Sequence, residues 1–184
     1  MKTLYIDNIS FLAFLKLLFL KNKKIEIKVL NDQFSYKRTL LRLLKAFRYS
    51  INVEDFFLGD IKDLNGESLH IVSRKKASEL ALNFSKWIML KKEIYKNGHE
   101  SKESKRIIEL FISKRTMLEF EYYTQRIEYI RSITKNDKEI NLWIRDSLLI
   151  NNKFIYEKFN YLNLELIKSF KREWIYRFKR FFKN

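Results

Sequence analysis

The stretch Lys2–Leu30 (KTLYIDNISFLAFLKLLFLKNKKIEIKVL) decides the fold. A short apolar run, Leu4–Ile6, is followed after four residues by the almost continuously apolar segment Phe11–Leu20. A second run, Ile25–Leu30, has the composition of a strand. A helix that is apolar around most of its circumference must be buried, and packing against a sheet would bury it. The stretch therefore predicts strand, helix and parallel strand, a unit from which larger α/β sheets are built.

The pattern that follows continues this alternation. The expected elements are, in order, a helix over 35–47, a strand over 51–57, a hairpin over 61–72 and a helix over 74–95 capped by Ser73. Asn65-Gly66 between two extended segments is a strong hairpin signal, because both residues tolerate a positive φ. The first half of the chain therefore predicts a Rossmann-like α/β fold with a mostly parallel sheet and a β-hairpin.

The second half is dominated by helical patterns. A long helix is expected from Ser101 or Ser104 to about Ile130, whereas 141–144 and 147–150 fit either a strand or a short helix. A final amphipathic helix is expected from Leu162 onward. The predicted division is an α/β core over 1–96, a helical continuation over 97–161 and a terminal helix over 162–184.

Composition limits the function classes. Hydrophobic residues form 46% of the 184 residues and aromatic residues 16%, which excludes a disordered chain. A net charge of +16 predicts partners that carry phosphate, such as nucleic acid, anionic lipid or a nucleotide-linked substrate. The absence of cysteine excludes disulfides and thiolate chemistry and fits a reducing compartment. No apolar run approaches the roughly 20 residues that span a bilayer, so we expect a cytoplasmic protein that is either soluble or attached peripherally to the inner face of the cell membrane.

The expected terminal helix combines an aromatic stripe with basic residues. Residues 168–184 contain seven Lys or Arg and one Glu. Aromatic side chains beside Lys and Arg are typical of a helix that lies in a membrane interface. The expected membrane contacts are Phe170, Trp174, Arg177, Phe178 and Phe181. Two alternatives are that the stripe packs on the chain's own core, or that the aromatic side chains stack on nucleic-acid bases.

Motifs of nucleotide loops, metal sites and nucleophilic triads are missing from the sequence, so no metal and no cofactor is expected. Three aspartates follow predicted strands, and the carboxyl ends of parallel strands are where ligands bind. Basic residues in the first turn of a helix suit an anion. The expected site consists of Asp60 and His70 as catalytic residues, with Asp7, Ser10, Asp32, Gly59, Arg74, Lys75 and Lys76 binding substrate. Each of these residues also has an ordinary explanation as a turn, cap or surface residue.

The run Leu4–Asp7, the apolar helix after it and Ile25–Leu30 resemble the N-terminal Rossmann-like half of bacterial GT-B-type glycosyltransferases of surface-polysaccharide biosynthesis. The stretches Asp55–Glu67 and Arg74–Ala81 add to the resemblance, which covers about the first half of the chain. It implies a membrane-associated enzyme that moves a sugar from a nucleotide-sugar to a saccharide or lipid-linked acceptor. In this family the N-terminal domain mainly handles the acceptor. The chain has no room for the donor domain, which a second domain or partner chain would then supply.

Three functions are therefore compared. An acceptor-side glycosyltransferase domain predicts a basic, apolar docking face and an incomplete active site. A non-enzymatic nucleic-acid-binding protein predicts affinity that falls steeply with salt. An interaction module predicts an exposed apolar patch that is large for a monomer.

Overall fold

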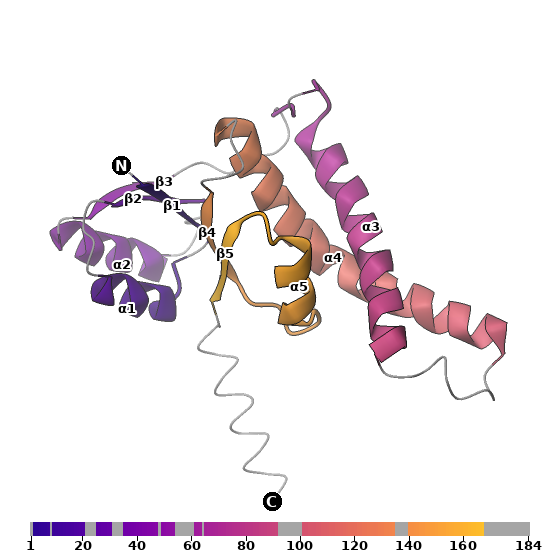
Figure 1. Cartoon of the computed structure of the whole chain (residues 1–184). Coiled ribbons are helices and arrows are strands. Elements are labelled where there is room, and N and C mark those ends of the chain that lie inside the picture. Colours follow the sequence, from indigo (N-terminus) through magenta and orange to yellow (C-terminus); the bar gives the residue numbers. More distant parts are fainter. Residues whose placement is uncertain are drawn as a thin grey trace, which may run out of the picture. The chain divides into compact units, whose positions relative to one another are not determined.

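A computed structural model describes residues 2–7, 9–20, 25–30, 35–47, 49–53, 61–63, 65–91, 101–134 and 140–167 (Figure 1). They divide into two compact units that alternate along the chain. The α/β unit lies within 1–56, 136–146 and 158–184, and the helical unit lies within 57–135 and 147–157. Both units therefore combine segments from the two halves of the sequence.

The α/β unit contains a five-stranded sheet in which every neighbouring pair is parallel. Its spatial order is β3-β2-β1-β4-β5. The strands are β1 (Lys2–Ile6), β2 (Ile25–Val29), β3 (Ser50–Val53), β4 (Asn141–Arg145) and β5 (Asn163–Ile167). Helix α1 (Phe11–Phe19) joins β1 to β2, and α2 (Ser35–Ala46) lies between β2 and β3. The predicted Rossmann-like α/β fold is confirmed.

The opening stretch folds as its sequence predicts. Ser10 has extended backbone angles, and its hydroxyl oxygen accepts a hydrogen bond from the amide of Ala13 at 3.1 Å. This side chain therefore caps α1, since a helix leaves its first amides without intrahelical partners. Leu20 returns to extended backbone and ends the helix. Lys2 then pairs with Ile25 in the register of β1 and β2.

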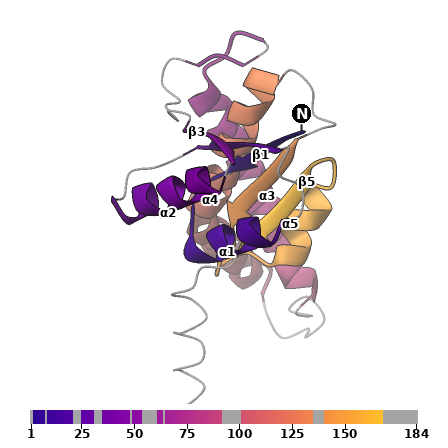
Figure 2. The same cartoon turned by 90° about the vertical axis from the view of Figure 1, so that its left-hand side faces the viewer.

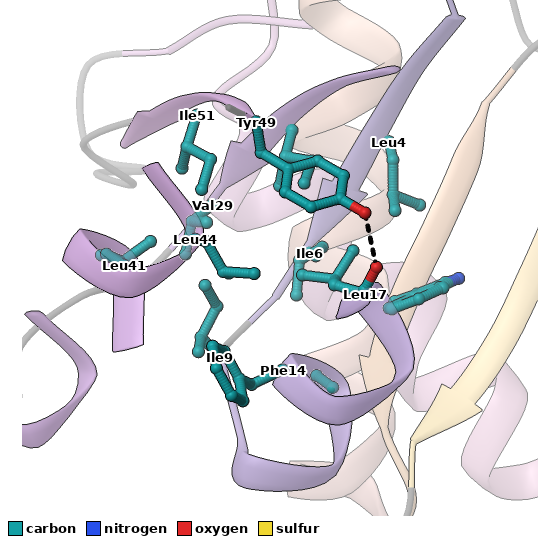
Figure 3. Packing of buried hydrophobic residues seen from close by; sticks show 13 residues of the cluster. Leu4, Ile6, Ile9, Phe14, Leu17, Val29, Leu41, Leu44, Tyr49 and Ile51 are labelled. Atoms are coloured by element: carbon teal, nitrogen blue, oxygen red, sulfur yellow. Dashed lines mark hydrogen bonds between the residues drawn. The ribbon is translucent and has the colours of Figure 1, made fainter. Parts of the chain in front are cut away.

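Helices α1 and α2 lie on the same face of the sheet (Figures 1 and 2). Apolar residues of β1, β2 and β3 pack against both helices (Figure 3). Within this core the hydroxyl of Tyr49 donates to the carbonyl oxygen of Leu17 at 2.7 Å, and it lies 3.2 Å from that of Leu20. Tyr49 thereby ties the C-terminal end of α1 to the start of β3, because the last carbonyls of a helix have no intrahelical donor.

The helical unit is built on two antiparallel helices, α3 (Leu69–Lys91) and α4 (Lys102–Thr134). The shorter α5 (Asn152–Lys158), which follows β4 in the chain, adds residues 152–157 to this unit. Small residues of α3 repeat every four positions and are completely buried: Ser73, Ala77, Ala81 and Ser85. This seam lets α4 approach closely, and the hydroxyl oxygen of Thr124 on α4 lies 2.8 Å from the carbonyl oxygen of Ser73. The rings of Phe84, Trp87, Phe120 and Phe154 pack together beside the seam.

The predicted hairpin is only partly present. Gly66 has a φ of 84°, and Lys62 and Ser68 form one antiparallel bridge across the turn. The prediction that the second strand of the hairpin extends to residue 72 is wrong, because Leu69 begins α3. Ser73 is therefore not a helix cap but an interior residue whose hydroxyl donates to the carbonyl of His70 at 3.0 Å. Leu69 and Val72 of this early turn are buried, and their burial outweighs the local strand preference of the segment.

The C-terminal half also differs from the sequence-based expectation. The segment 141–144, which fitted a strand or a short helix, belongs to β4, while 147–150 belongs to neither a strand nor a helix. Asn163–Ile167, expected as the start of the last helix, forms β5. Its backbone pairs in parallel with β4 along all five residues, and this ladder satisfies the hydrogen bonds that a helix would otherwise supply. The rest of the expected terminal helix, including Phe170, Trp174, Arg177, Phe178 and Phe181, lies outside the described residues.

Candidate functional site

The boundary between β1 and β4 differs from the other strand boundaries of the sheet, because the strand order reverses there. From β1 the chain passes through α1 to β2 on one side, whereas β4 pairs with β1 on the other side. The strand order therefore reverses between β1 and β4. In open α/β sheets, ligands bind outside the carboxyl ends of the strands at such a reversal point. The candidate site is accordingly the carboxyl edge of β1 and β4.

Two aspartates occupy this edge. Asp7 directly follows β1 and is 1% exposed, and its backbone amide donates to the carbonyl of Trp143 at 2.9 Å. Asp146 directly follows β4, and its amide donates to the carbonyl of Ile167 at 3.0 Å. These backbone bonds hold both residues at the ends of two adjacent strands. Of the two, Asp146 is partly exposed and is suited to accept a hydrogen bond from a hydroxyl group of a sugar or ribose, whereas Asp7 is almost completely buried.

The N-terminal end of α1 lies at the same edge, since α1 starts four residues after Asp7. Ser10 caps it, and its first turn contains no acidic residue. Free amides and the positive end of the helix dipole together favour an anion. Asp7, Asp146 and the start of α1 thus combine acceptors for hydroxyls with donors for a phosphate or carboxylate.

The described residues of the expected site lie in both units of the structure. Asp7 and Ser10 lie at the carboxyl edge of the α/β unit, whereas four others lie on α3 of the helical unit: His70, Arg74, Lys75 and Lys76. His70, Arg74 and Lys75 are exposed. Asp32, Gly59 and Asp60 lie outside the described residues. Of the expected site, the described part of the α/β unit therefore contains Asp7 and Ser10.

Lys76 has a clear structural partner. Its Nζ lies 2.8 Å from Oε2 of Glu128, and Nη1 of Arg131 lies 3.3 Å from Oε1 of the same carboxylate. The side chain of Glu128 is 10% exposed, so it accepts from both cations in a largely buried setting between α3 and α4. Lys75 makes a looser contact, 3.6 Å from Glu67, on an exposed surface where an ion pair stabilises little. Lys76 thus joins the two helices.

Sequence reasoning missed Asp146. The residue comes immediately after 141–144, a segment whose assignment the sequence left open between strand and helix. Had that segment been assigned as a strand, the same rule that selected Asp7 would have selected Asp146. The missing information was the pairing of β4 with β1, which brings together segments from opposite ends of the chain.

A hollow of about 510 Å³ lies elsewhere in the α/β unit, beside α1. Its lining includes the first residues of several strands, Ile25, Asn141 and Asn163 among them, so it lies toward their amino ends. Lys16 and Glu165 form an ion pair across it, and the Lys16 ammonium lies 5.2 Å from the centre of the Trp143 ring. The two charges of the lining thus satisfy each other. We therefore place the candidate site at the carboxyl edge, where Asp7, Asp146 and the N-terminal end of α1 lie.

Comparison of the chain with protein-family models, with curated proteins and with solved structures finds no match. No group of three His, Asp or Glu side chains that could hold a metal ion occurs among the described residues. Within the same part of the chain, no helix combines the length and apolar character needed to cross a membrane. The description of the site therefore rests on its own geometry.

Proposed function

We propose that the α/β unit binds a hydroxyl-rich saccharide at the carboxyl edge of β1 and β4. The observation that carries this proposal is the placement of Asp7 and Asp146 at the ends of two adjacent parallel strands, at the reversal of the strand order. Carboxylates that accept hydrogen bonds from sugar hydroxyls give both affinity and discrimination, because an analogue without the hydroxyl loses that hydrogen bond.

Within this class, the chain acts as the acceptor-side domain of a membrane-associated glycosyltransferase of surface-polysaccharide biosynthesis. The resemblance of Lys2–Leu30 to that family and the Rossmann-like strand order support this function. The donor nucleotide then binds to a second domain or a partner chain. Asp146 orients the acceptor hydroxyl and can also take its proton. The buried Asp7 holds the end of β1 against β4 through its amide bond to Trp143.

Nucleic-acid binding is the second candidate, and the charge of the helical unit favours it. The described surfaces of α3 and α4 carry exposed basic side chains: Arg74, Lys75, Lys86, Lys91, Lys102, Arg106, Lys114 and Arg115. Such a surface would bind phosphates without reading sequence, with an affinity that falls linearly with salt on logarithmic axes. This function needs neither Asp7 nor Asp146.

Saturation-transfer NMR with hexose glycosides, UDP-hexoses and a short RNA separates the two functions. The variant is Asp146→Asn, which keeps the shape of the side chain, and the matched control is Glu79→Gln, an exposed residue of α3. A lost hydrogen bond to a charged group costs about 1.5–3 kcal/mol, so sugar affinity should fall roughly 10- to 100-fold in Asp146→Asn and stay unchanged in the control.

Unchanged sugar binding by both Asp146→Asn and Asp7→Asn, each shown to be folded by circular dichroism, would contradict the proposed site. Binding of RNA alone, with a steep salt dependence that neither substitution alters, would favour the second function.

A further inference from the structure

The first half of α4 exposes large apolar side chains. Ile107 is 62% exposed, Leu110 56%, Phe111 62% and Leu118 75%. We call these four residues the α4 apolar face. Single exposed apolar residues are ordinary on a protein surface, but a group on one side of a helix marks a place of contact.

The four residues lie on one side of α4, and α3 packs on the other. Residues 107, 111 and 118 follow the spacing of four and seven that keeps side chains in line along a helix. Buried residues such as Thr116 and Phe120 are two positions from Leu118, about 200° around the helix axis. The α4 apolar face therefore points away from α3 and extends along roughly 16 Å of helix.

Basic side chains accompany this face. Lys114 lies within the stripe, and Arg106 and Arg115 flank it, all three exposed. Residues 102–118 contain five Lys or Arg and two Glu. A partner must therefore accept apolar side chains and also offer negative charge.

A second copy of the chain fits these requirements poorly. Its own α4 would bring the same cations against Lys114, Arg106 and Arg115. The four side chains also offer roughly 400 Å², about half of the 800 Å² that each partner buries in a specific protein interface. An anionic lipid surface fits both properties, because it takes up an apolar stripe at the level of its headgroups and attracts the neighbouring Lys and Arg side chains.

We propose that the α4 apolar face lies on an anionic lipid surface, with Phe111 and Leu118 among the headgroups and upper acyl chains. This inference concerns the helical unit and does not depend on sugar binding by the α/β unit. It also places a lipid contact on a described helix, separate from the contacts that the sequence predicts in 168–184.

The test uses the absence of cysteine, which allows a single label at a chosen site. The full chain with Leu118→Cys carries an environment-sensitive NBD fluorophore, and Ser78→Cys on the exposed side of α3 serves as the matched control. Both are mixed with vesicles of phosphatidylglycerol and phosphatidylcholine, or of phosphatidylcholine alone. We expect a blue shift and quenching by doxyl-labelled lipid at position 118, with anionic vesicles only, and neither effect at position 78.

A second variant separates this face from the end of the chain. Phe111→Ser in the Leu118→Cys background should reduce the quenching at least threefold, whereas Trp174→Ser should leave the probe at 118 quenched in the bound fraction. If the protein floats with the vesicles while the probe at 118 stays in water, the membrane contact lies elsewhere and the proposal fails. A blue shift without vesicles that grows with protein concentration would assign the face to a second copy and also overturn it. So would the absence of any binding.

Discussion

Replacing Tyr49 by Phe tests how the end of α1 is held in the α/β unit. The ring of Tyr49 is buried with the whole residue 5% exposed, and its hydroxyl donates to the carbonyl of Leu17 at 2.7 Å (Figure 3). Tyr49→Phe keeps the ring and removes the donor. The change therefore removes the hydroxyl's bond to Leu17 and its longer contact with the Leu20 carbonyl at 3.2 Å, both at the C-terminal end of α1.

The expected loss of free energy depends on which hydrogen bonds the Leu17 carbonyl retains in Tyr49→Phe. The amide of Leu20 still donates to the same Leu17 oxygen at 3.1 Å, so the acceptor retains one partner. The loss is then that of one ordinary buried hydrogen bond, about 0.5–1.5 kcal/mol, rather than the larger cost of an acceptor with no partner. A loss of 1 kcal/mol corresponds to roughly a fivefold change in a local opening equilibrium.

Native-state hydrogen exchange measures this opening segment by segment. Amides of α1 should exchange about fivefold faster in Tyr49→Phe, while those of α3 in the helical unit should keep their wild-type rates. Helix α3 serves as the control within the same sample, since it belongs to the other compact unit.

An increase of less than twofold in α1 would show that the hydroxyl contributes nothing net to its C-terminal end. An equal increase in α1 and α3 would show that the two units open together, which would refute the assignment of a local effect. Either result would show that the Tyr49 hydroxyl does not anchor the C-terminal end of α1.

Two further substitutions test the helical unit and the turn before it. Ala77→Leu inserts a large side chain into the completely buried α3 seam and should lower the free energy of unfolding, measured by urea titration, by about 1–3 kcal/mol. Ser78→Leu, at the exposed neighbouring position, should change this free energy by less than about 0.5 kcal/mol. Equal effects of the two substitutions would contradict the packing of the seam. The Cβ of Gly66→Ala would meet no atom within 4 Å, but the residue must adopt a φ of 84°, so the free energy of unfolding should fall by about 1 kcal/mol. Gly66→Asn should lower it less, because Asn tolerates this conformation. An unchanged free energy of unfolding in Gly66→Ala would show that the turn can rearrange.

The sequence alone was sufficient for the opening unit. In Lys2–Leu30 the strand, the capped helix and the second strand are adjacent along the chain, and each carries its own local signal. Ser10 marks the helix start, and the apolar girth of Phe11–Leu20 requires burial against a sheet. The α/β class followed from this unit because such a helix has few other ways to be buried.

Local patterns failed where long-range pairing decides the structure. The run 141–144 has a composition that suits a strand or a helix, and its assignment as β4 depends on pairing with β1 from the other end of the sequence. Asn163–Ile167 became β5 for the same reason, through its ladder with β4. The burial of Leu69 and Val72 likewise favours a helix that begins at Leu69.

The candidate site divides in the same way. The sequence by itself selected Asp7 and Ser10 as substrate-binding residues, because a polar residue after a predicted strand is read from its neighbours. The structure shows in addition that Ser10 caps α1. Only the tertiary structure placed the end of β4, which Asp146 follows, at the same sheet edge as the end of β1, which Asp7 follows. It also paired Lys76 with Glu128, a residue from a distant segment. The physical reason is that hydrogen-bonded strand pairing and helix packing join residues by position in space, which local periodicity does not encode.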